Sequence, residues 1–305
     1  MSVERRDLLR LGARLKLDVA ASEVVEALRE RDVPVIVLKG SALAERLYGP
    51  DSLRSHDDVD LLVRGEDIRD AGEGLAELGF RMADEEDYAQ AWIRAADGVT
   101  VDLHTTLVGV GVSAQEAWNL LARETTEARL GRTRLSVFDD AALALHVALH
   151  AAQHGPRGGK GIEDLRRAVD ELDESAWRAA AGLAEQLDAT AAFAAGLRLV
   201  PAGADLAGEL GLSSARPAAV ALRAASPPPT ALGLQRLLQA QGFGAKAKLL
   251  ARELAPSPAF MRAVYPVARR GSLGLVTSYA WRPFWLLWHA GPALRAWRRA
   301  QRPGG

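Results

Sequence analysis

The spacing of hydrophobic positions predicts β-strands in the first half of the chain. The run VIVL over residues 35–38 is wholly apolar and rich in β-branched side chains, which predicts a strand buried on both faces. Residues 58–63 first alternate polar and apolar positions and then become wholly apolar, as in a strand that enters the core from a solvent-facing end. Shorter strands are predicted around Arg81, over 92–94 and over 99–107.

Helices are predicted between and around these strands. Apolar side chains recur at helical spacing over three segments, which are residues 1–32 (as two helices), 42–48 and 66–79. Gly79 ends the third segment, because glycine readily takes the left-handed conformation that closes a helix. The Asp97-Gly98 dipeptide suits a tight primed turn and predicts a hairpin between the last two strands.

After Asp140 the pattern becomes helical throughout. Ala- and Leu-rich segments follow one another from residue 141 to beyond 230, with a triple-proline bend at 227–229. A chain of 305 residues has the length of about two domains. The expected fold class is therefore α+β, with a mixed sheet flanked by helices over residues 1–135 and an all-helical domain over residues 136–305.

Charge divides the chain near the same place. Residues 1–140 hold 28 acids and 18 bases, a net charge of −10, whereas residues 141–305 hold 11 acids and 20 bases, a net charge of +9. The acidic half favours divalent cations over nucleic acid as a ligand. Alternatively, the opposite charges only help the two halves to dock.

Residue types and segments that the sequence lacks exclude several classes of protein. The chain has no cysteine, which excludes thiolate catalysis, iron–sulfur clusters and disulfides. No stretch reaches 18 uninterrupted apolar residues, and the first residues lack the apolar core of a signal peptide. We therefore expect a cytoplasmic protein without transmembrane helices.

Acidic residues lie at the ends of the predicted strands. Asp58 and Asp60 are two residues apart in one strand and share a face, and Asp102 lies on a later strand. Carboxylates that close repel one another unless a cation lies between them, and Mg²⁺ accepts carboxylate and phosphate oxygens. The backbone N–H groups of the nearby Gly40-Ser41 turn suit a phosphate group. Together, the turn and the three acids predict a phosphoryl-transfer site that uses two metal ions. Alternatively, they are plain strand-end carboxylates.

The motifs around these residues resemble a known superfamily. The stretches VIVLKGSALAERLYG, LRSHDDVDLLV and TVDLHTTL are similar to bacterial nucleotidyltransferase family proteins of the polymerase β-like nucleotidyltransferase superfamily. The downstream stretches LALHVALHAAQHG and EDLRRAVDEL are similar to the second domain of that group. The resemblance implies a catalytic domain over residues 1–135, joined to a helical domain that shapes the acceptor site.

The resemblance implies a role for each of the three acids. Asp58 and Asp60 would hold the Mg²⁺ ion that bridges the nucleoside triphosphate, and would share a second Mg²⁺ ion with Asp102. Asp102 would also be the base that accepts the proton of an acceptor hydroxyl as its oxygen attacks the α-phosphorus and pyrophosphate leaves.

The same resemblance assigns the residues that would bind the nucleotide. Gly40 and Ser41 would cradle the β- and γ-phosphates. Lys39 and Arg54 would neutralise phosphate charge, Arg54 in bidentate fashion. Two alternatives stay open: Ser41 is only a helix N-cap, and Lys39 is only a solvated charge.

The implied activity is transfer of a nucleotidyl group, most readily AMP from ATP, to a hydroxyl of a small molecule, a peptide or a protein. Ser41 is followed by an ordinary helix, residues 42–45, in place of the small residues usual in the superfamily, which leaves the choice of nucleotide open. Two other functions fit the sequence: a catalytically idle scaffold that binds nucleotide or peptide in a biosynthetic complex, and a phosphotransferase that uses the same carboxylates.

Histidines gather near the predicted site. His104 lies two residues beyond Asp102 on the same strand face, which makes it a candidate contact for the substrate or for the acids. His146, His150 and His154 recur every four residues along one helix face. We expect His150 and His154 to face the site; a zinc-binding pair and simple packing are the alternatives.

The end of the chain mixes tryptophan and arginine. Residues 281–302 hold four tryptophans and five arginines and no acid, a mixture suited to a membrane surface or to single-stranded nucleic acid. No specific nucleic acid is expected. The alternatives are a terminal helix whose tryptophans pack on the helical domain and a surface for a peptide or protein partner.

Overall fold

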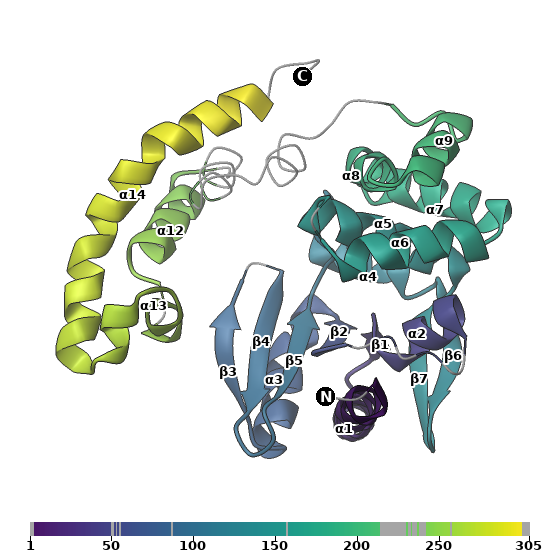
Figure 1. Ribbon diagram of the computed structural model, residues 1–305, viewed down its shortest axis with the longest axis horizontal. Coiled ribbons are helices and arrows are strands. Elements are labelled where there is room, and N and C mark those ends of the chain that lie inside the picture. The colour runs from purple at the N-terminus through teal and green to yellow at the C-terminus, as the bar shows by residue number, and fades with distance from the viewer. Residues whose placement is uncertain are drawn as a thin grey trace.

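The structure is a computed structural model that describes residues 3–49, 52, 54, 56–86, 88–156, 158–213, 230, 233, 237, 242–256 and 258–300. A seven-stranded mixed sheet of order β3-β4-β5-β2-β1-β7-β6 lies at its centre (Figure 1). β1 pairs with β7 in parallel, as β2 does with β5. The strands are β1 (Val35–Val37), β2 (Val59–Val63), β3 (Phe80–Glu85), β4 (Ala89–Arg94), β5 (Val99–His104), β6 (Thr125–Leu130) and β7 (Thr133–Phe138).

Helices surround this sheet and make up nearly all of the described part of the second half, which confirms the predicted α+β class. Those of the first half are α1 (Val3–Glu30), α2 (Ser41–Tyr48), the 3₁₀ turn η1 (Gly65–Asp67), α3 (Ile68–Glu77) and α4 (Ala114–Leu121). Those of the second half are α5 (Asp140–His154), α6 (Lys160–Glu171), α7 (Glu174–Gln186), α8 (Thr190–Leu197), α9 (Pro201–Glu209), α12 (Phe243–Leu254), α13 (Pro258–Val264), η2 (Pro266–Arg269) and α14 (Ser272–Ala300).

Successive residues of the central strands serve two separate cores. Val37 and Leu61 belong to the core that α1 and α3 close on one face of the sheet. Ile36 and Leu62, their chain neighbours, belong to the core under α5 and the helices packed on it. This alternation follows from the two-residue period of a strand. It means that every second residue of β2 and β5 points towards α5, which lies on the opposite side of the sheet from α1 (Figure 1).

The N-terminal segment differs from its prediction. Residues 1–32 were expected to form two helices, but one helix, α1, runs over Val3–Glu30. Gly12, the weakest helix former in this segment, lies inside the helix without ending it. Burial explains the continuity, because Leu17, Val24 and Leu28 line one side of α1 and pack into the core beneath the sheet.

The pattern analysis also missed α4 and the β6–β7 hairpin. The strand predicted over 99–107 ends at His104, and its connection to β4 has four residues, 95–98, in place of a two-residue turn. β7 pairs with β1, so the part of the chain that forms the sheet continues to Phe138. Helix α5 begins two residues later, at Asp140. The division into domains at residue 135 stays a prediction.

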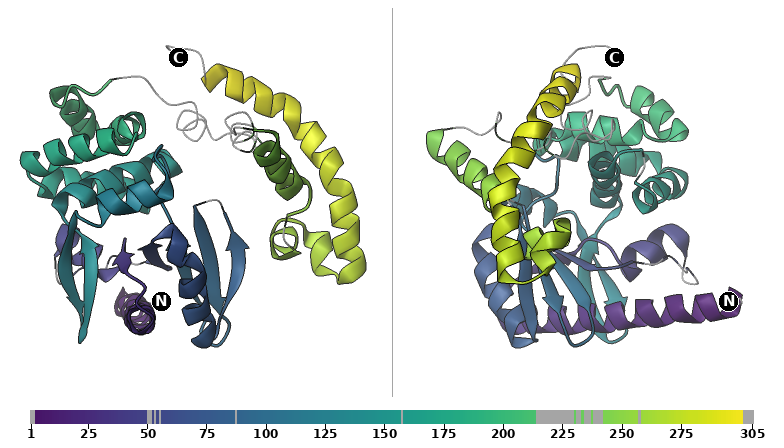
Figure 2. Two further views of the ribbon diagram at one scale, coloured as in Figure 1. Left: turned by 180° about the vertical axis from the view of Figure 1, so that it is seen from behind. Right: turned by 60° about the vertical axis from the view of Figure 1, so that its left-hand side comes forward.

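The helical half is built around α5. This helix is buried along most of its length and packs against α6, α7 and α8. Helices α12, α13 and α14 lie apart from that bundle, along the sheet edge formed by β3, against which α13 packs (Figures 1 and 2). The predicted proline bend at 227–229 lies outside the described residues. No helix in the described part of the chain is long and apolar enough to cross a membrane.

Close packing of α8 on α5 gives a test of this arrangement. Gly196 of α8 lies so near the backbone of Ala148 that an added Cβ atom would collide with its carbonyl oxygen. Gly196→Ala should therefore lower the free energy of unfolding by about 1–3 kcal/mol. Gly182→Ala, inside α7, is the matched control, because a Cβ atom added there would have no neighbour within 4 Å. This substitution should raise the free energy of unfolding by about 0.5–1 kcal/mol. Urea unfolding measures both, and equal effects would contradict the packing.

Candidate active site

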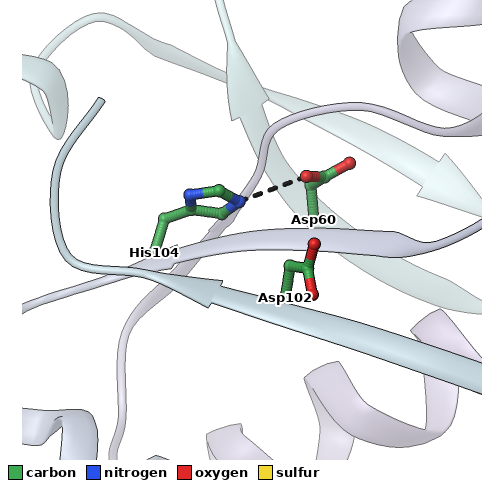
Figure 3. Close-up of side chains that lie close together, drawn as sticks. All are labelled: Asp60, Asp102 and His104. Atoms are coloured by element: carbon green, nitrogen blue, oxygen red, sulfur yellow. Dashed lines mark hydrogen bonds and ion pairs between the residues drawn. The ribbon is translucent and has the colours of Figure 1, made fainter. Parts of the chain in front are cut away.

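Strand register brings two of the predicted acids side by side. Asp60 of β2 lies opposite Asp102 of β5 in a parallel pair of strands. Their neighbours Leu61 and Leu103 point into the core under α1 and α3, so both carboxylates point to the other face, towards α5. His104 follows on that face, two residues beyond Asp102. Figure 3 shows the three side chains gathered in one place, with His104 joined to Asp60.

Asp60 is the most enclosed of the acids, with 3% of its side chain exposed. Its Oδ1 atom accepts hydrogen bonds from Lys39 Nζ at 3.0 Å and from His104 Nε2 at 3.2 Å. Burial alone would raise its pKa, but the His104 hydrogen bond and the Lys39 charge outweigh burial and hold the pKa far below its usual range. Asp60 is therefore ionised. Its second oxygen, Oδ2, is buried without a hydrogen-bond partner.

The other two acids are held in an environment that disfavours their charge. Burial raises the pKa of Asp102, and the charge of Asp60 raises it further. Burial and the charge of Asp60 likewise raise the pKa of Asp58 to about 6. Asp102 Oδ1, like Asp60 Oδ2, is buried without a partner. Two buried carboxylate oxygens without hydrogen-bond partners, on neighbouring strands, form a donor set whose chemistry suits a hard cation.

These acids lie in a cleft of about 510 Å³. Lys39 and Arg54 line the cleft together with the acids. One wall comes from the β3–β4 hairpin, with Asp84, and the other from the helical half, with His150 and Lys160. The cleft therefore combines a carboxylate cluster with cationic side chains that suit a phosphorylated ligand.

Arg54 is fixed from the helical half of the chain. Asp164 of α6 accepts from Arg54 Nε at 2.6 Å and from Arg54 Nη2 at 2.5 Å, and its Oδ1 also accepts from the hydroxyl of Tyr48 at 2.8 Å. The side chains of Arg54 and Asp164 are 8% and 3% exposed. Arg54 Nη1 keeps no hydrogen-bond partner. The fork of Arg54 that was expected to bind phosphate therefore binds Asp164 through Nε and Nη2, and a role of Arg54 with phosphate stays a prediction.

The Gly40-Ser41 turn lies behind the cleft instead of lining it. Gly40 takes a left-handed φ of 87° and is the N-cap of α2, so the alternative reading of Ser41 as the N-cap is wrong. The Ser41 hydroxyl donates to Asp18 Oδ1 at 2.5 Å and accepts from Arg14 Nε at 3.0 Å, both from α1. The role of this turn with phosphates stays a prediction. Lys39, its neighbour, is no merely solvated charge, because it binds Asp60.

Of the three histidines on α5, two line the cleft and one is buried in the core. His150 and His154 line the cleft, as expected from the sequence, whereas His146 does not. Burial lowers the pKa of His146 to about 3 and that of His150 to about 2, so both rings are neutral. Among the described residues, the cluster with metal-binding geometry is Asp60, Asp102 and His104, and the α5 histidines are not in it.

Sequence reasoning missed the residues that hold the site residues in place. Asp18 contacts Ser41 and lies 3.6 Å from the buried His56, and Asp57 pairs with Lys160 across the cleft at 2.7 Å. Asp164 did carry a signal: it lies in α6 among the buried Gly161, Leu165 and Ala168, within an otherwise apolar stripe. A buried acid in such a stripe requires a partner.

The mixed sheet, the carboxylate cluster and the cationic cleft define a site of the phosphoryl-transfer class. The family model described as "Uncharacterised nucleotidyltransferase" matches residues 11–202. The chain therefore belongs to this nucleotidyltransferase family, which confirms the resemblance found in its motifs. No match to the chain was found among curated proteins.

Three solved structures show what the chain is similar to. A crystal structure of ANT(2″)-Ia in complex with adenylyl-2″-tobramycin is 20% identical, with a TM-score of 0.43, over 55% of this chain and 97% of that chain. The lincosamide antibiotic adenylyltransferase LnuA, lincomycin-bound, is 12% identical with a TM-score of 0.35, over 48% and 91%. An antigenic nucleotidyltransferase-like protein from Paracoccidioides brasiliensis is 16% identical with a TM-score of 0.34, over 59% and 91%.

The raised pKa of Asp58 predicts how the metal-free protein responds to pH. A carboxyl group whose pKa rises from 3.8 to about 6 on folding stabilises the fold when protonated, and this contribution is lost as pH rises through that interval. With a chelator present, Asp58→Asn should therefore match the wild type near pH 4 and exceed its Tm by roughly 2–4 °C at pH 7.5.

Asp57→Asn is the matched control, because Asp57 is exposed at the surface and its ion pair with Lys160 contributes little. It should leave Tm within about 1 °C at both pH values. Calorimetry measures these shifts. A lower Tm for Asp58→Asn at pH 7.5 would contradict the repulsion among the acids.

Proposed function

We propose that the protein transfers a nucleotidyl group, most readily AMP from ATP, to a hydroxyl group of a small molecule, a peptide or a protein. The observation that carries this proposal is the pairing of Asp60 with Asp102 in register, with an unpartnered buried oxygen on each. Membership in a nucleotidyltransferase family supports the reaction class. The open cleft beside the pair has room for a nucleotide and an acceptor.

The donor set fits Mg²⁺. Asp58, Asp60 and Asp102 supply hard carboxylate oxygens, and two of these oxygens are buried and lack a partner. We assign two ions to these acids, Asp60 and Asp102 being the central pair. When bound, Mg²⁺ neutralises the triphosphate and the charge that develops on it. Lys39 supplies part of the same compensation from the protein, because its ammonium group lies 3.0 Å from Asp60.

We infer that Asp102 is the general base. Burial and the charge of Asp60 raise its pKa, which makes it a stronger base than an ordinary carboxylate. It accepts the proton of the acceptor hydroxyl while that oxygen forms a bond to the α-phosphorus. The bond from the α-phosphorus to the bridging oxygen breaks, and pyrophosphate leaves with the electron pair.

The remaining side chains position the reactants. His104 fixes one oxygen of Asp60 and leaves the other, which is buried and has no hydrogen-bond partner, for a ligand. Arg54, held by Asp164, presents Nη1 as a donor to a phosphate oxygen. His150 is neutral and suits a polar contact to the base, the sugar or the acceptor.

A labelling experiment tests the reaction class. The protein is incubated with Mg²⁺, cell extract and ATP labelled at the α-phosphorus, and the labelled product is identified. Asp102→Asn and Asp60→Asn should each reduce transfer by about 10²–10⁴-fold, whereas Asp57→Asn should retain it. A parallel reaction with γ-labelled ATP should yield labelled pyrophosphate. Transfer of the γ-label to the acceptor, or full activity in Asp102→Asn, would overturn the proposal.

The Arg54–Asp164 pair predicts a separate effect on nucleotide binding. Asp164→Asn leaves Arg54 without its fixed charge partner, so the KM for the nucleotide should rise about tenfold, with a smaller change in kcat. Tyr48→Phe removes one hydrogen bond to Asp164 and should raise KM by about twofold. Steady-state kinetics on protein shown by circular dichroism to be folded measures both. An unchanged KM in Asp164→Asn would show that Arg54 does not contact the nucleotide.

A further inference from the structure

Helix α14 presents its apolar side chains outward. Its inner side carries small and polar residues, such as Ser278 and Arg282, each 4% exposed, and Arg282 is anchored on Glu253 of α12. Its outer side carries large apolar residues with high exposed fractions. They are Leu273 (80%), Val276 (64%), Trp281 (57%), Phe284 (64%), Leu287 (74%) and Trp288 (82%).

These six positions form one continuous stripe, which we call the outer face of α14. The first five recur every three to five residues, and Trp288 directly follows Leu287, so all six lie along one side of the helix. Trp281 and Phe284 stack with ring centroids 6.4 Å apart. The sequence alternative in which the tryptophans pack on the helical domain holds for Trp285, whose ring lies 6.4 Å from that of Tyr265, but not for the exposed Trp281 and Trp288. Six large exposed apolar side chains in one patch mark a docking surface.

Charge identifies the kind of surface that fits this face. Residues 243–300 hold ten Lys and Arg and one acid, Glu253, a net charge of +9. Exposed arginines flank the stripe, with Arg269 and Arg270 before it and Arg295 and Arg298 after it. A second copy of the chain on this face would bring two strongly positive segments together, which opposes such a dimer. An anionic surface with an apolar layer beneath it complements both features.

We propose that the outer face of α14 docks the protein on the surface of an anionic lipid bilayer. The helix lies parallel to the membrane, with Trp281, Phe284 and Trp288 inserted at the boundary between headgroups and acyl chains and the arginines among the lipid phosphates. The apolar stretch from Leu273 to Leu287 extends about 21 Å at 1.5 Å per residue, so it lies on the bilayer and does not span it. This inference is independent of the proposed reaction.

The chain offers a matched control in α1. That helix also exposes apolar side chains, with Leu8 at 69%, Leu15 at 55% and Val19 at 67%. However, residues 3–30 hold six acids and six bases, a net charge of zero, so this stripe has no attraction for anionic lipid. Comparison of the two stripes separates specific docking from general stickiness of exposed apolar residues.

Vesicle flotation tests the proposal with the full chain. Vesicles of phosphatidylcholine with 30% phosphatidylglycerol, and of phosphatidylcholine alone, are mixed with the protein at about 50 and 500 mM NaCl. We expect binding to the anionic vesicles at least tenfold stronger than to the neutral ones, weakened by salt. The variant Trp281→Ser/Phe284→Ser/Leu287→Ser/Trp288→Ser should lose at least tenfold of this binding, and Leu8→Ser/Leu15→Ser/Val19→Ser should keep it.

Three results would overturn the proposal. They are an absence of binding to either vesicle, equal binding by the α14 variant, and a wild-type dimer in sedimentation that the α14 variant alone abolishes, which would make the face an interface between copies. The four substituted side chains are exposed, so the variant should keep the wild-type circular dichroism spectrum. Nucleotide-dependent activity in the absence of lipid should also be unchanged, which separates this test from that of the reaction.

Discussion

Repulsion between carboxylates at one place in the sheet is the constraint on which the site depends. Asp60 and Asp102 are brought side by side by the register of the parallel strands β2 and β5, which is set by the backbone and not by the side chains. Lys39 and His104 both bind one oxygen of Asp60, whereas their effect on the other two acids is too weak to offset burial and the charge of Asp60, so the pKa values of Asp58 and Asp102 stay raised. Partial compensation keeps the fold stable without a cation and still leaves net negative charge for one. A fully paired cluster would have no remaining affinity for a metal ion.

The helical half completes this site as well as covering the sheet. Arg54 comes from the segment before β2, yet its geometry is set by Asp164 on α6, more than a hundred residues later. Lys160, at the start of α6, reaches Asp57 on the opposite side of the cleft. Burial of α5 against the sheet places the neutral His150 at the cleft wall. Arg54 and Lys160 are therefore held in place only when both halves are folded together.

The local sequence pattern was sufficient to predict which acids lie on the strands of the site, but not to predict which residues contact them. The two-residue period of a strand predicts that His104 faces the same way as Asp102, and the structure agrees because strand geometry is local; the register of β2 on β5 then places Asp60 beside Asp102. The side-chain partners of Ser41 and Arg54 lie on α1 and α6, and no local pattern encodes such contacts. The β6–β7 hairpin was missed for a related reason: TTEARL lies at the sheet edge, half exposed, and has no continuous apolar run.

Helices α5 and α14, both rich in large apolar residues, show how position in the fold changes what such residues do. α5 is apolar on nearly all sides and buried, so its composition serves packing. α14 packs through Gly274, Ser278, Arg282 and Ala293, which lets it lie close to η2 and α12 while its aromatic residues stay outside. Folding alone does not account for this choice, because exchanging the two faces would bury more apolar area. Exposing these apolar side chains to water is unfavourable, yet it recurs along the described length of α14. This indicates that the outer face contacts a medium other than water.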